Sequence, residues 1–349
     1  MSSCPHPSDD RWPTGFLLTR RTPLSDLRAV AYEFEHVPSG ARILHLHAAD
    51  TENCFAAIFP TPPPDDTGLP HILEHAVLGG SRKFPVREPF FEMVKMSMAT
   101  FINAMTSQTY TVYPVATNVK KDFFNLAEVY LDAVFHPLLD EATFRREGHH
   151  LTLADNGDLA APLTISGIVY NEMKGAYSTP ESLAWEFSVR PLFPDTPLGR
   201  DAGGDPDRIP ELTFEQFQRF YAAHYHPSNA LLFLYGDIPT REHLEFLAPT
   251  LGEFARRPAL RATPRQPRWT APRVLERAYP LGPDETAADR TFLTLNWLVG
   301  DALDPAALLD WEVLTNVLLG NEAAPLRKAL IDAHLGADVF LAGAMEHAY

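Results

Sequence analysis

Apolar and polar residues alternate along several segments of the chain, as expected for half-buried strands. Residues 41–48 (ARILHLHA) place leucines on one face and histidines on the other, and residues 54–60 (CFAAIFP) are a second predicted strand. Residues 229–238 (NALLFLYGDI) read as a buried strand. Residues 100–117 (TFINAMTSQTYTVYPVAT) predict a hairpin that turns near Ser107.

Apolar residues at helical spacing mark the segments that cover these strands. Residues 120–135 (KKDFFNLAEVYLDAVF) and 213–225 (TFEQFQRFYAAHY) are amphipathic, so each is predicted to pack one face into a core. Residues 88–99 predict another helix, and residues 163–178 (LTISGIVYNEMKGAYS) lead into a further one. Together the segments predict an α+β fold, with a mixed or antiparallel sheet covered by helices.

The pattern changes near residue 255. Residues 255–273 (ARRPALRATPRQPRWTAPR) are basic and rich in proline without periodicity, which is typical of a linker. Beyond it, residues 289–300 (DRTFLTLNWLVG) predict a strand and residues 304–319 predict a helix. We therefore expect three parts: a first domain over residues 15–255, a linker over residues 256–274, and the start of a small or truncated second domain over residues 275–349.

Composition limits the class of protein. The chain has 349 residues, 45% of them hydrophobic and 21% charged, which is ordinary for a soluble globular protein. No apolar run approaches the roughly 20 residues that cross a bilayer, so no membrane partner is expected. A net charge of −16 argues against nucleic acid as a partner. Two cysteines and no signal peptide predict a cytoplasmic location.

The strongest chemical signal lies in residues 69–85 (LPHILEHAVLGGSRKFP), which begin with a short predicted helix that has Thr67 as its N-cap and is closed by Gly79 and Gly80. His71 and His75 are four residues apart, so their imidazoles share a face and can bind one zinc ion. Glu74 lies beside them and is placed to take a proton from the ion's water, whose pKa zinc lowers to about 7. H-x-x-E-H is a known zinc-peptidase signature. The same residues also fit the exposed face of an ordinary helix, and the motif alone leaves both interpretations open.

A catalytic zinc ion needs a third protein ligand. Glu172, after the apolar residues 168–170, is the candidate, although a glutamate at a helix start is also common for electrostatic reasons. His149 and His150 alternate across a strand and cannot both face one ion. His224 and His226 lie just before Pro227 and read as structural residues, and His136, which precedes Pro137 at a helix end, reads as a partner of the helix dipole.

Ordered sequence blocks around these residues resemble the pitrilysin/insulinase family of inverted-motif zinc peptidases, and within it the presequence-protease-like branch. The blocks are TGLPHILEHAVLGGSRKFPVREPF (67–90), TFINAMTSQTYTVYPVAT (100–117), GIVYNEMKGAYSTPES (167–182), GGDPDRIPELTFEQF (203–217) and HYHPSNALLFLYGD (224–237). The resemblance covers residues 15–255 and, weakly through residues 324–339, the second domain. It implies a metallopeptidase domain like that of mitochondrial processing peptidase.

The resemblance also implies roles for single residues. His71, His75 and Glu172 match the zinc ligands, which gives one Zn²⁺ per chain, and Glu74 matches the catalytic base. Asn103 and Ala104 match the family's substrate-binding edge strand, where an extended peptide adds to the sheet. From the residues alone, Asn103 is better explained as a turn former at a strand end.

The resemblance implies a zinc-dependent endopeptidase that degrades unstructured peptides. Members of this branch have two homologous halves, and the second half is not recognisable in this sequence. Two other functions therefore stay open: a non-catalytic peptide-binding subunit, and a fragment that needs a complementary C-terminal half or partner subunit for activity.

Overall fold

The computed structural model describes residues 12–87, 89–155, 157–258, 260, 264–282, 285–334 and 336. It divides into two compact units. One consists of the chain up to Leu183 together with Arg200–Thr263, and the other of Ala184–Gly199 together with the chain from Pro264 onward. All the candidate site residues lie in the first unit.

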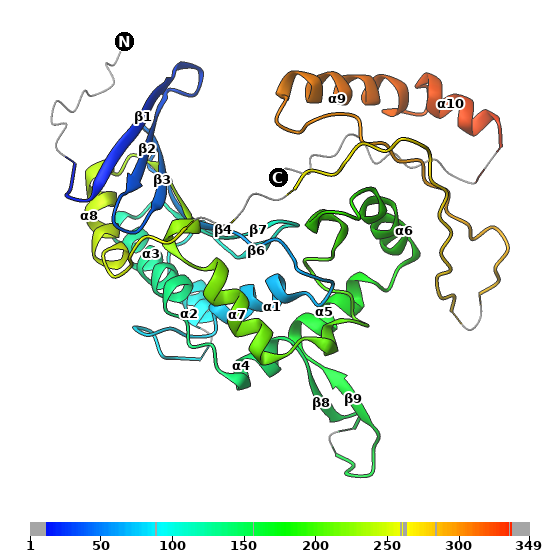
Figure 1. Cartoon of the computed structure of the whole chain (residues 1–349), viewed down its shortest axis with the longest axis horizontal. Coiled ribbons are helices and arrows are strands. Elements are labelled where there is room, and N and C mark those ends of the chain that lie inside the picture. Colours follow the sequence, from blue (N-terminus) through cyan, green and yellow to red (C-terminus); the bar gives the residue numbers. More distant parts are fainter. Residues whose placement is uncertain are drawn as a thin grey trace. The chain divides into compact units, whose positions relative to one another are not determined.

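The first unit is built on a mixed sheet of eight strands (Figure 1). Its strands in spatial order are β1 (Phe16–Leu24), β2 (Ala29–His36), β3 (Ala41–Ala48), β10 (Leu231–Gly236), β4 (Asn53–Pro60), β7 (Tyr110–Thr117) and β5 (Phe101–Ile102), with β6 (Met105–Thr106) also paired to β7. Only β10 and β3 run parallel among these pairs. The sheet therefore ends, on one side, at the short strands β5 and β6.

Helices cover the sheet because alternate strand residues point into a shared apolar core. The helices of this unit are α1 (Leu69–Val77), α2 (Pro89–Met96), α3 (Lys120–Phe135), α4 (Glu141–Glu147), α5 (Ile168–Ala176), α7 (Phe214–His224) and α8 (Thr240–Leu251). Helix α3 packs on β4 and β7, α8 on β3, and α1 on β6 and β7. Ile43, Phe59, Tyr113, Phe123 and Leu234 are fully or almost fully buried between these layers.

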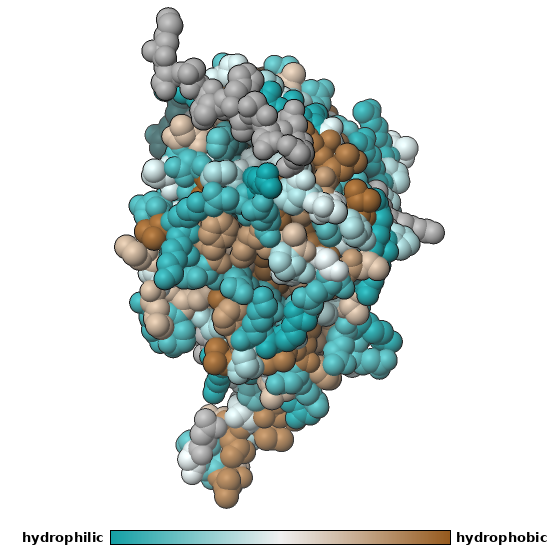
Figure 2. Space-filling view, turned by 90° about the vertical axis from the view of Figure 1, so that its left-hand side faces the viewer, coloured by the Kyte–Doolittle hydropathy of each residue, from teal (hydrophilic) through white to brown (hydrophobic). Residues whose placement is uncertain are grey.

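Several shorter elements complete the chain. Strands β8 (His150–Leu153) and β9 (Leu163–Ser166) form a separate hairpin, which protrudes at the foot of Figure 2 and exposes Leu151 and Leu163. Helix α6 (Pro180–Val189) spans the boundary between the units. Within the described residues, the 3₁₀ helices are Ser25–Leu27, Arg190–Leu192, Pro197–Gly199, Ile209–Glu211 and Pro227–Asn229.

The structure confirms the predicted fold class and most of the predicted elements. The strand over residues 41–48 and the helix over residues 120–135 have the predicted bounds. The hairpin over residues 100–117 is present, with β5 and β6 paired to β7. Strands β1 and β2 and helix α8 were not predicted. In β1 most residues are exposed or half-buried, so the strand carries no regular apolar alternation.

Two local predictions were wrong. The N-cap of α1 is Gly68, not Thr67, and it has a left-handed backbone with φ of 68°. The Thr67 hydroxyl instead donates to the Asp65 carboxylate at 2.6 Å. Residues 289–300 form no strand, and this segment pairs with no other strand among the residues described. An extended segment without a partner strand leaves its backbone groups without hydrogen bonds, so alternation of apolar residues alone does not make a strand.

The second unit contains helices α9 (Pro305–Leu319) and α10 (Pro325–Asp332), and α9 confirms the helix predicted over residues 304–319. Residues 337–349 of the predicted second domain, and residues 259 and 261–263 of the predicted linker, lie outside the described residues. No helix in the described part of the chain is both long and apolar enough to span a membrane.

Candidate metal-binding and catalytic site

Helix α1 carries two of the candidate ligands, and its position is fixed at its start and along its buried face. A Cβ atom on Gly68 would lie 2.6 Å from the Gly203 carbonyl oxygen, so glycine is needed where these two loops meet. Ile72 and Leu73 are completely buried in the core. The helix therefore cannot rotate without exposing them, and the opposite face, with His71 and His75, stays directed away from the core.

Three side chains converge on this face of α1. Nε2 of His71 lies 3.7 Å and Nε2 of His75 lies 3.8 Å from Oε2 of Glu172, which comes from α5. One ligand atom from each of the three residues lies within 4.8 Å of the other two. The imidazole side chains are 12% and 25% exposed and the carboxylate is 55% exposed, so the group is open to solvent on one side. Two imidazoles and one carboxylate are a donor set that suits a divalent metal ion.

The Nδ1 atom of each imidazole, on the side of the ring away from Glu172, has a partner within the protein. His71 Nδ1 lies 3.2 Å from the Gly203 carbonyl oxygen, and His75 Nδ1 lies 3.3 Å from Oε2 of Glu147. Because a carbonyl oxygen only accepts, the hydrogen of a neutral His71 belongs on Nδ1, which leaves the Nε2 lone pair directed toward Glu172. Metal-binding histidines are commonly oriented in this way.

Charge around His75 follows from the same contacts. Burial lowers the pKa of His75, but the hydrogen bond that its ring donates to Glu147 and the charges of the nearby carboxylates outweigh burial and raise the pKa overall. Burial raises the pKa of Glu147, yet its bonds to His75 and to Arg146, whose Nε donates at 2.8 Å, bring it below the usual value. Glu147 is therefore an ionised, oriented partner of the imidazole.

Glu74 lies on the same helix but has a different environment. It is 7% exposed, and the Thr106 hydroxyl of β6 donates to its Oε2 at 2.7 Å. It is not one of the three converging residues. The site thus contains two carboxylates: Glu172 is one of the three converging residues, and Glu74 lies on α1 beside the two histidines.

The position of Glu172 depends on close packing at the start of α5. A Cβ atom on Gly167, the residue before the helix, would lie 2.0 Å from the Gly148 carbonyl oxygen at the end of α4. The backbones of the two segments touch directly. This contact brings α5, and with it Glu172, to the face of α1.

Asn103 and Ala104 lie between β5 and β6, at the end of the sheet nearest the site. Oδ1 of Asn103 accepts from the Ala104 amide at 3.0 Å, which is the local bond expected of a turn former. The Asn103 amide donates to the Pro114 carbonyl at 3.2 Å, so the edge remains attached to β7. No further strand pairs beyond β5 and β6 in the described part of the sheet, which leaves their outer edge available.

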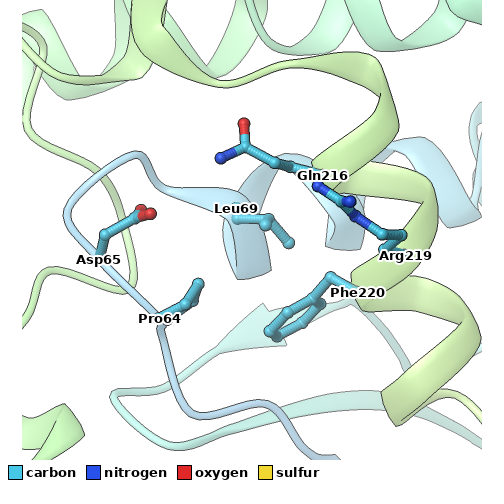
Figure 3. A pocket seen from close by; sticks show the side chains of 6 residues that line it. All are labelled: Pro64, Asp65, Leu69, Gln216, Arg219 and Phe220. Carbon is cyan, nitrogen blue, oxygen red and sulfur yellow. The ribbon is translucent and has the colours of Figure 1, made fainter.

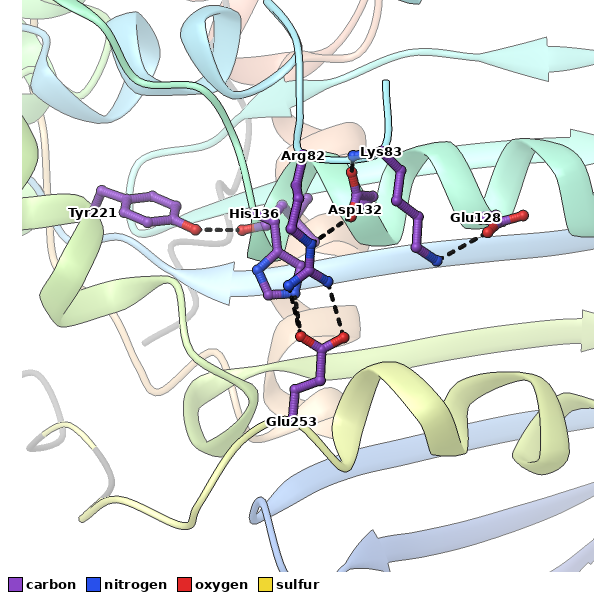
Figure 4. A network of polar contacts seen from close by, with 8 residues as sticks. Arg82, Lys83, Glu128, Asp132, His136, Tyr221 and Glu253 are labelled. Atoms are coloured by element: carbon purple, nitrogen blue, oxygen red, sulfur yellow. Dashed lines mark hydrogen bonds and ion pairs between the residues drawn. The ribbon is translucent and has the colours of Figure 1, made fainter. Parts of the chain in front are cut away.

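A polar network fixes the loop that follows α1 (Figure 4). Arg82 donates two hydrogen bonds to Glu253, at 2.7 and 2.9 Å. The Lys83 amide donates to the buried Asp132 carboxylate at 2.6 Å. These bonds join the loop to α3 and to the residues after α8, and they hold the C-terminal end of the motif helix.

A cavity of about 290 Å³ lies between the start of α1 and α7 (Figure 3). None of the three converging residues lines it. The residues that do are Pro64, Asp65, Leu69, Gln216, Arg219 and Phe220. Its polar side chains already bind elsewhere, since Asp65 accepts from Thr67 and Gln216 caps α7. This cavity is separate from the candidate site.

Glu147, Thr106 and Gly203 contact the site from α4, β6 and a loop, and no pattern in the sequence marks them as site residues. A glutamate among the arginines of residues 145–147 carries no signal that distinguishes it from an exposed one. The other candidate histidines lie outside the site: Nε2 of His136 is 3.4 Å from the Glu253 carboxylate, and the remaining four contact backbone groups. The contacts are His149 to the Leu212 carbonyl, His150 to the Arg145 carbonyl, His224 to the Phe220 carbonyl, and the Ser228 amide to His226.

The sequence and the fold are similar to those of known peptidases. Residues 62–155 match the family described as insulinase (peptidase family M16), and residues 211–346 match the peptidase M16 inactive domain. The chain is 42% identical over 328 residues to the mitochondrial presequence protease of Mus musculus. It is 41% identical over 326 residues to Protein HypA of Clostridium perfringens (strain 13 / Type A).

These alignments cover 93% of this chain but 32% and 33% of the two relatives, so the chain spans about a third of their length. Among solved structures, the crystal structure of pitrilysin is similar with a TM-score of 0.56 and 19% identity, over 74% of this chain and 26% of that one. That similarity concerns the fold. With two matched domains, extended sequence similarity to presequence protease and a shared fold, the chain belongs to the insulinase family of peptidases, peptidase family M16.

Proposed function

We propose that this chain carries the zinc-binding and peptide-cleaving site of an endopeptidase that acts on unstructured peptides. The observation that supports this is the convergence of His71, His75 and Glu172. Zinc ligands at about 2.0–2.1 Å in tetrahedral geometry lie roughly 3.3–3.5 Å from each other. The distances of 3.7 and 3.8 Å from the two Nε2 atoms to Glu172 are close to this value. Both distances to the carboxylate therefore suit a shared zinc ion, and the three ligand atoms lie within 4.8 Å of one another.

When bound, zinc would supply Lewis-acid activation of the attacking water and of the scissile carbonyl group. Glu74, next to the ligand group, would act as general base toward the water and then return the proton to the leaving amine. Its near-complete burial excludes bulk water from this carboxylate. Gly203 and Glu147 hold the imidazoles in the orientation that binding requires.

The free edge of β5 and β6 would bind the substrate. An extended peptide added there gains backbone hydrogen bonds with little demand on its sequence, which suits a peptidase for unstructured substrates. Asn103 and Ala104 lie at the centre of this edge. Thr106, at its end, bonds to Glu74, so the edge leads directly to the base.

A second function has support from the comparisons. Because the chain spans about a third of its relatives' length, it could bind zinc and peptide while cleavage needs a complementary C-terminal half or partner subunit. This version keeps the same ligands and the same edge strand. It differs only in that a further half or subunit would have to enclose the substrate before cleavage.

Replacing Glu74 by Gln tests the proposed function. The amide cannot accept the proton, so cleavage of an internally quenched peptide should fall at least about 1,000-fold while zinc content stays near one per chain. Glu141→Gln, which changes an exposed glutamate of α4, is the matched control and should cleave normally. Retained cleavage in Glu74→Gln would exclude Glu74 as the base. Zinc binding without cleavage in the unmodified chain would favour the second function.

A further inference from the structure

The buried carboxylate of Glu74 has a single hydrogen-bond donor among the described residues. That donor is the hydroxyl of Thr106, at 2.7 Å from Oε2. A buried carboxylate needs donors to offset the loss of water, and bonds to a charged acceptor are stronger than those between neutral groups. No bond of the described residues reaches the other oxygen, Oε1, which stays free for a reacting group. The bond to Thr106 thus determines which oxygen is available.

Three tyrosines feel the charge of Glu74, but their hydroxyl groups form hydrogen bonds with other partners. Tyr130 donates to the Asn103 carbonyl at 2.9 Å, and the hydroxyls of Tyr113 and Tyr225 pair with each other at 2.7 Å. All three tyrosines have a raised pKa, chiefly because they are buried and also because the Glu74 charge is near. They remain neutral. They do not replace Thr106 as the donor.

Thr106 is itself held from inside the sheet. Its backbone pairs with Thr111 in β7, and its hydroxyl lies 3.5 Å from the Thr111 hydroxyl. Thr111 is completely buried and its hydroxyl bonds to that of Thr61 at 2.7 Å. The inner side of β6 is therefore fixed, whereas its outer side pairs with no strand that the structure describes. One residue joins this free edge to the carboxylate.

We infer that Thr106 is a positioning residue: its hydroxyl orients the Glu74 carboxylate and links it to the edge on which a peptide docks. This inference rests on the proposed function, because it assigns a purpose to a bond made with the proposed base. A peptide that adds to β6 restrains the Thr106 backbone, and the hydroxyl passes that restraint to Glu74. Substrate binding and alignment of the base are then one event.

Thr106→Val and Thr106→Ser test this role. Valine keeps the shape but removes the donor, so kcat should fall about 10- to 100-fold while KM changes less than about threefold. Serine keeps the donor and should restore kcat to within about threefold of the original value. Thr22→Val makes the same change in β1, the edge strand at the other end of the sheet, and should leave both constants unchanged. Zinc content should stay near one per chain in all variants.

Unfolding of the metal-free protein gives a readout that does not depend on activity. In a double-mutant cycle of Thr106→Val with Glu74→Gln, the effects on the unfolding equilibrium constant should deviate from additivity by about tenfold. Additive effects, an unchanged kcat in Thr106→Val, or a serine variant as slow as the valine variant would each overturn the role of Thr106. If the unmodified chain binds zinc but does not cleave, the first proposed function is overturned, and the unfolding cycle alone decides the role of Thr106.

Discussion

At the scale of single residues, the imidazole of His243 is in an unusual position. It is completely buried between α8, β3 and α3, and neither ring nitrogen has a hydrogen-bond partner. The titratable groups that act on its ring are His47 from β3 and Lys120 from α3, and the ring of His45 from β3 lies against it. Burial, followed by these neighbouring charges, lowers the pKa of His243 from 6.5 to about 3. The folded protein therefore holds a neutral imidazole at neutral pH.

This predicts acid sensitivity. Below about pH 6.5 the unfolded chain binds a proton at His243 and the folded chain does not, so stability present above that pH is lost as pH falls toward 3. In urea unfolding, His243→Phe should reduce the loss of stability between pH 7 and pH 5 by about 2 kcal/mol. His150→Phe, on the exposed hairpin, is the control. An unchanged pH dependence in His243→Phe would show that other groups cause the acid sensitivity.

At the scale of elements, the site depends on how α5 meets α4. Helix α5 begins after Gly167, whose missing side chain allows its backbone to touch the Gly148 carbonyl. The third candidate ligand, Glu172, lies about 1.4 turns beyond Gly167, since about 3.6 residues make a turn. A displacement at the start of the helix therefore moves the carboxylate away from the imidazoles of α1.

Gly167→Ala should show this dependence. Its Cβ atom would lie 2.0 Å from a backbone oxygen that cannot move aside, so we expect a loss of stability of about 1–3 kcal/mol and weaker zinc binding. Gly175→Ala, in the same helix, meets nothing within 4 Å and should raise stability by up to about 1 kcal/mol. Chelator-competition titration and urea unfolding measure both effects. Equal zinc affinity in the two variants would contradict the proposed role of the contact.

At the scale of the whole molecule, the apolar core and the candidate site belong to the same unit. The core residues and all three converging side chains lie in the unit formed by the chain up to Leu183 and Arg200–Thr263. In the second unit, helices α9 and α10 contain no buried residue. Metal binding should therefore depend on the first unit only.

A chain that ends at residue 258 tests this separation. It retains every strand of the eight-stranded sheet and helices α1–α8, so it should unfold cooperatively and bind zinc with an affinity within about threefold of the longer chain. Circular dichroism during heating and zinc titration are the measurements. Loss of cooperative unfolding would show that the first unit needs residues beyond 258.

Local spacing made part of the site predictable. The pairing of His71 with His75, and the place of Glu74 beside them, follow from the geometry of one helix. Glu172 was different, because its own surroundings fitted an ordinary helix start and only the resemblance to a family selected it. Residues that act through distant contacts, such as Glu147 and Thr106, gave no signal.

By itself the sequence determined the α+β class, the bounds of elements such as β3 and α3, and the shared face of His71 and His75. Each of these depends on neighbours within one segment, where backbone geometry fixes the periodicity. Only the tertiary structure decided that Glu172 reaches those imidazoles, that Glu147 and Gly203 orient them, and that Thr106 holds Glu74. These contacts join segments far apart in the chain, so they depend on packing between helices and sheet, which no local pattern encodes.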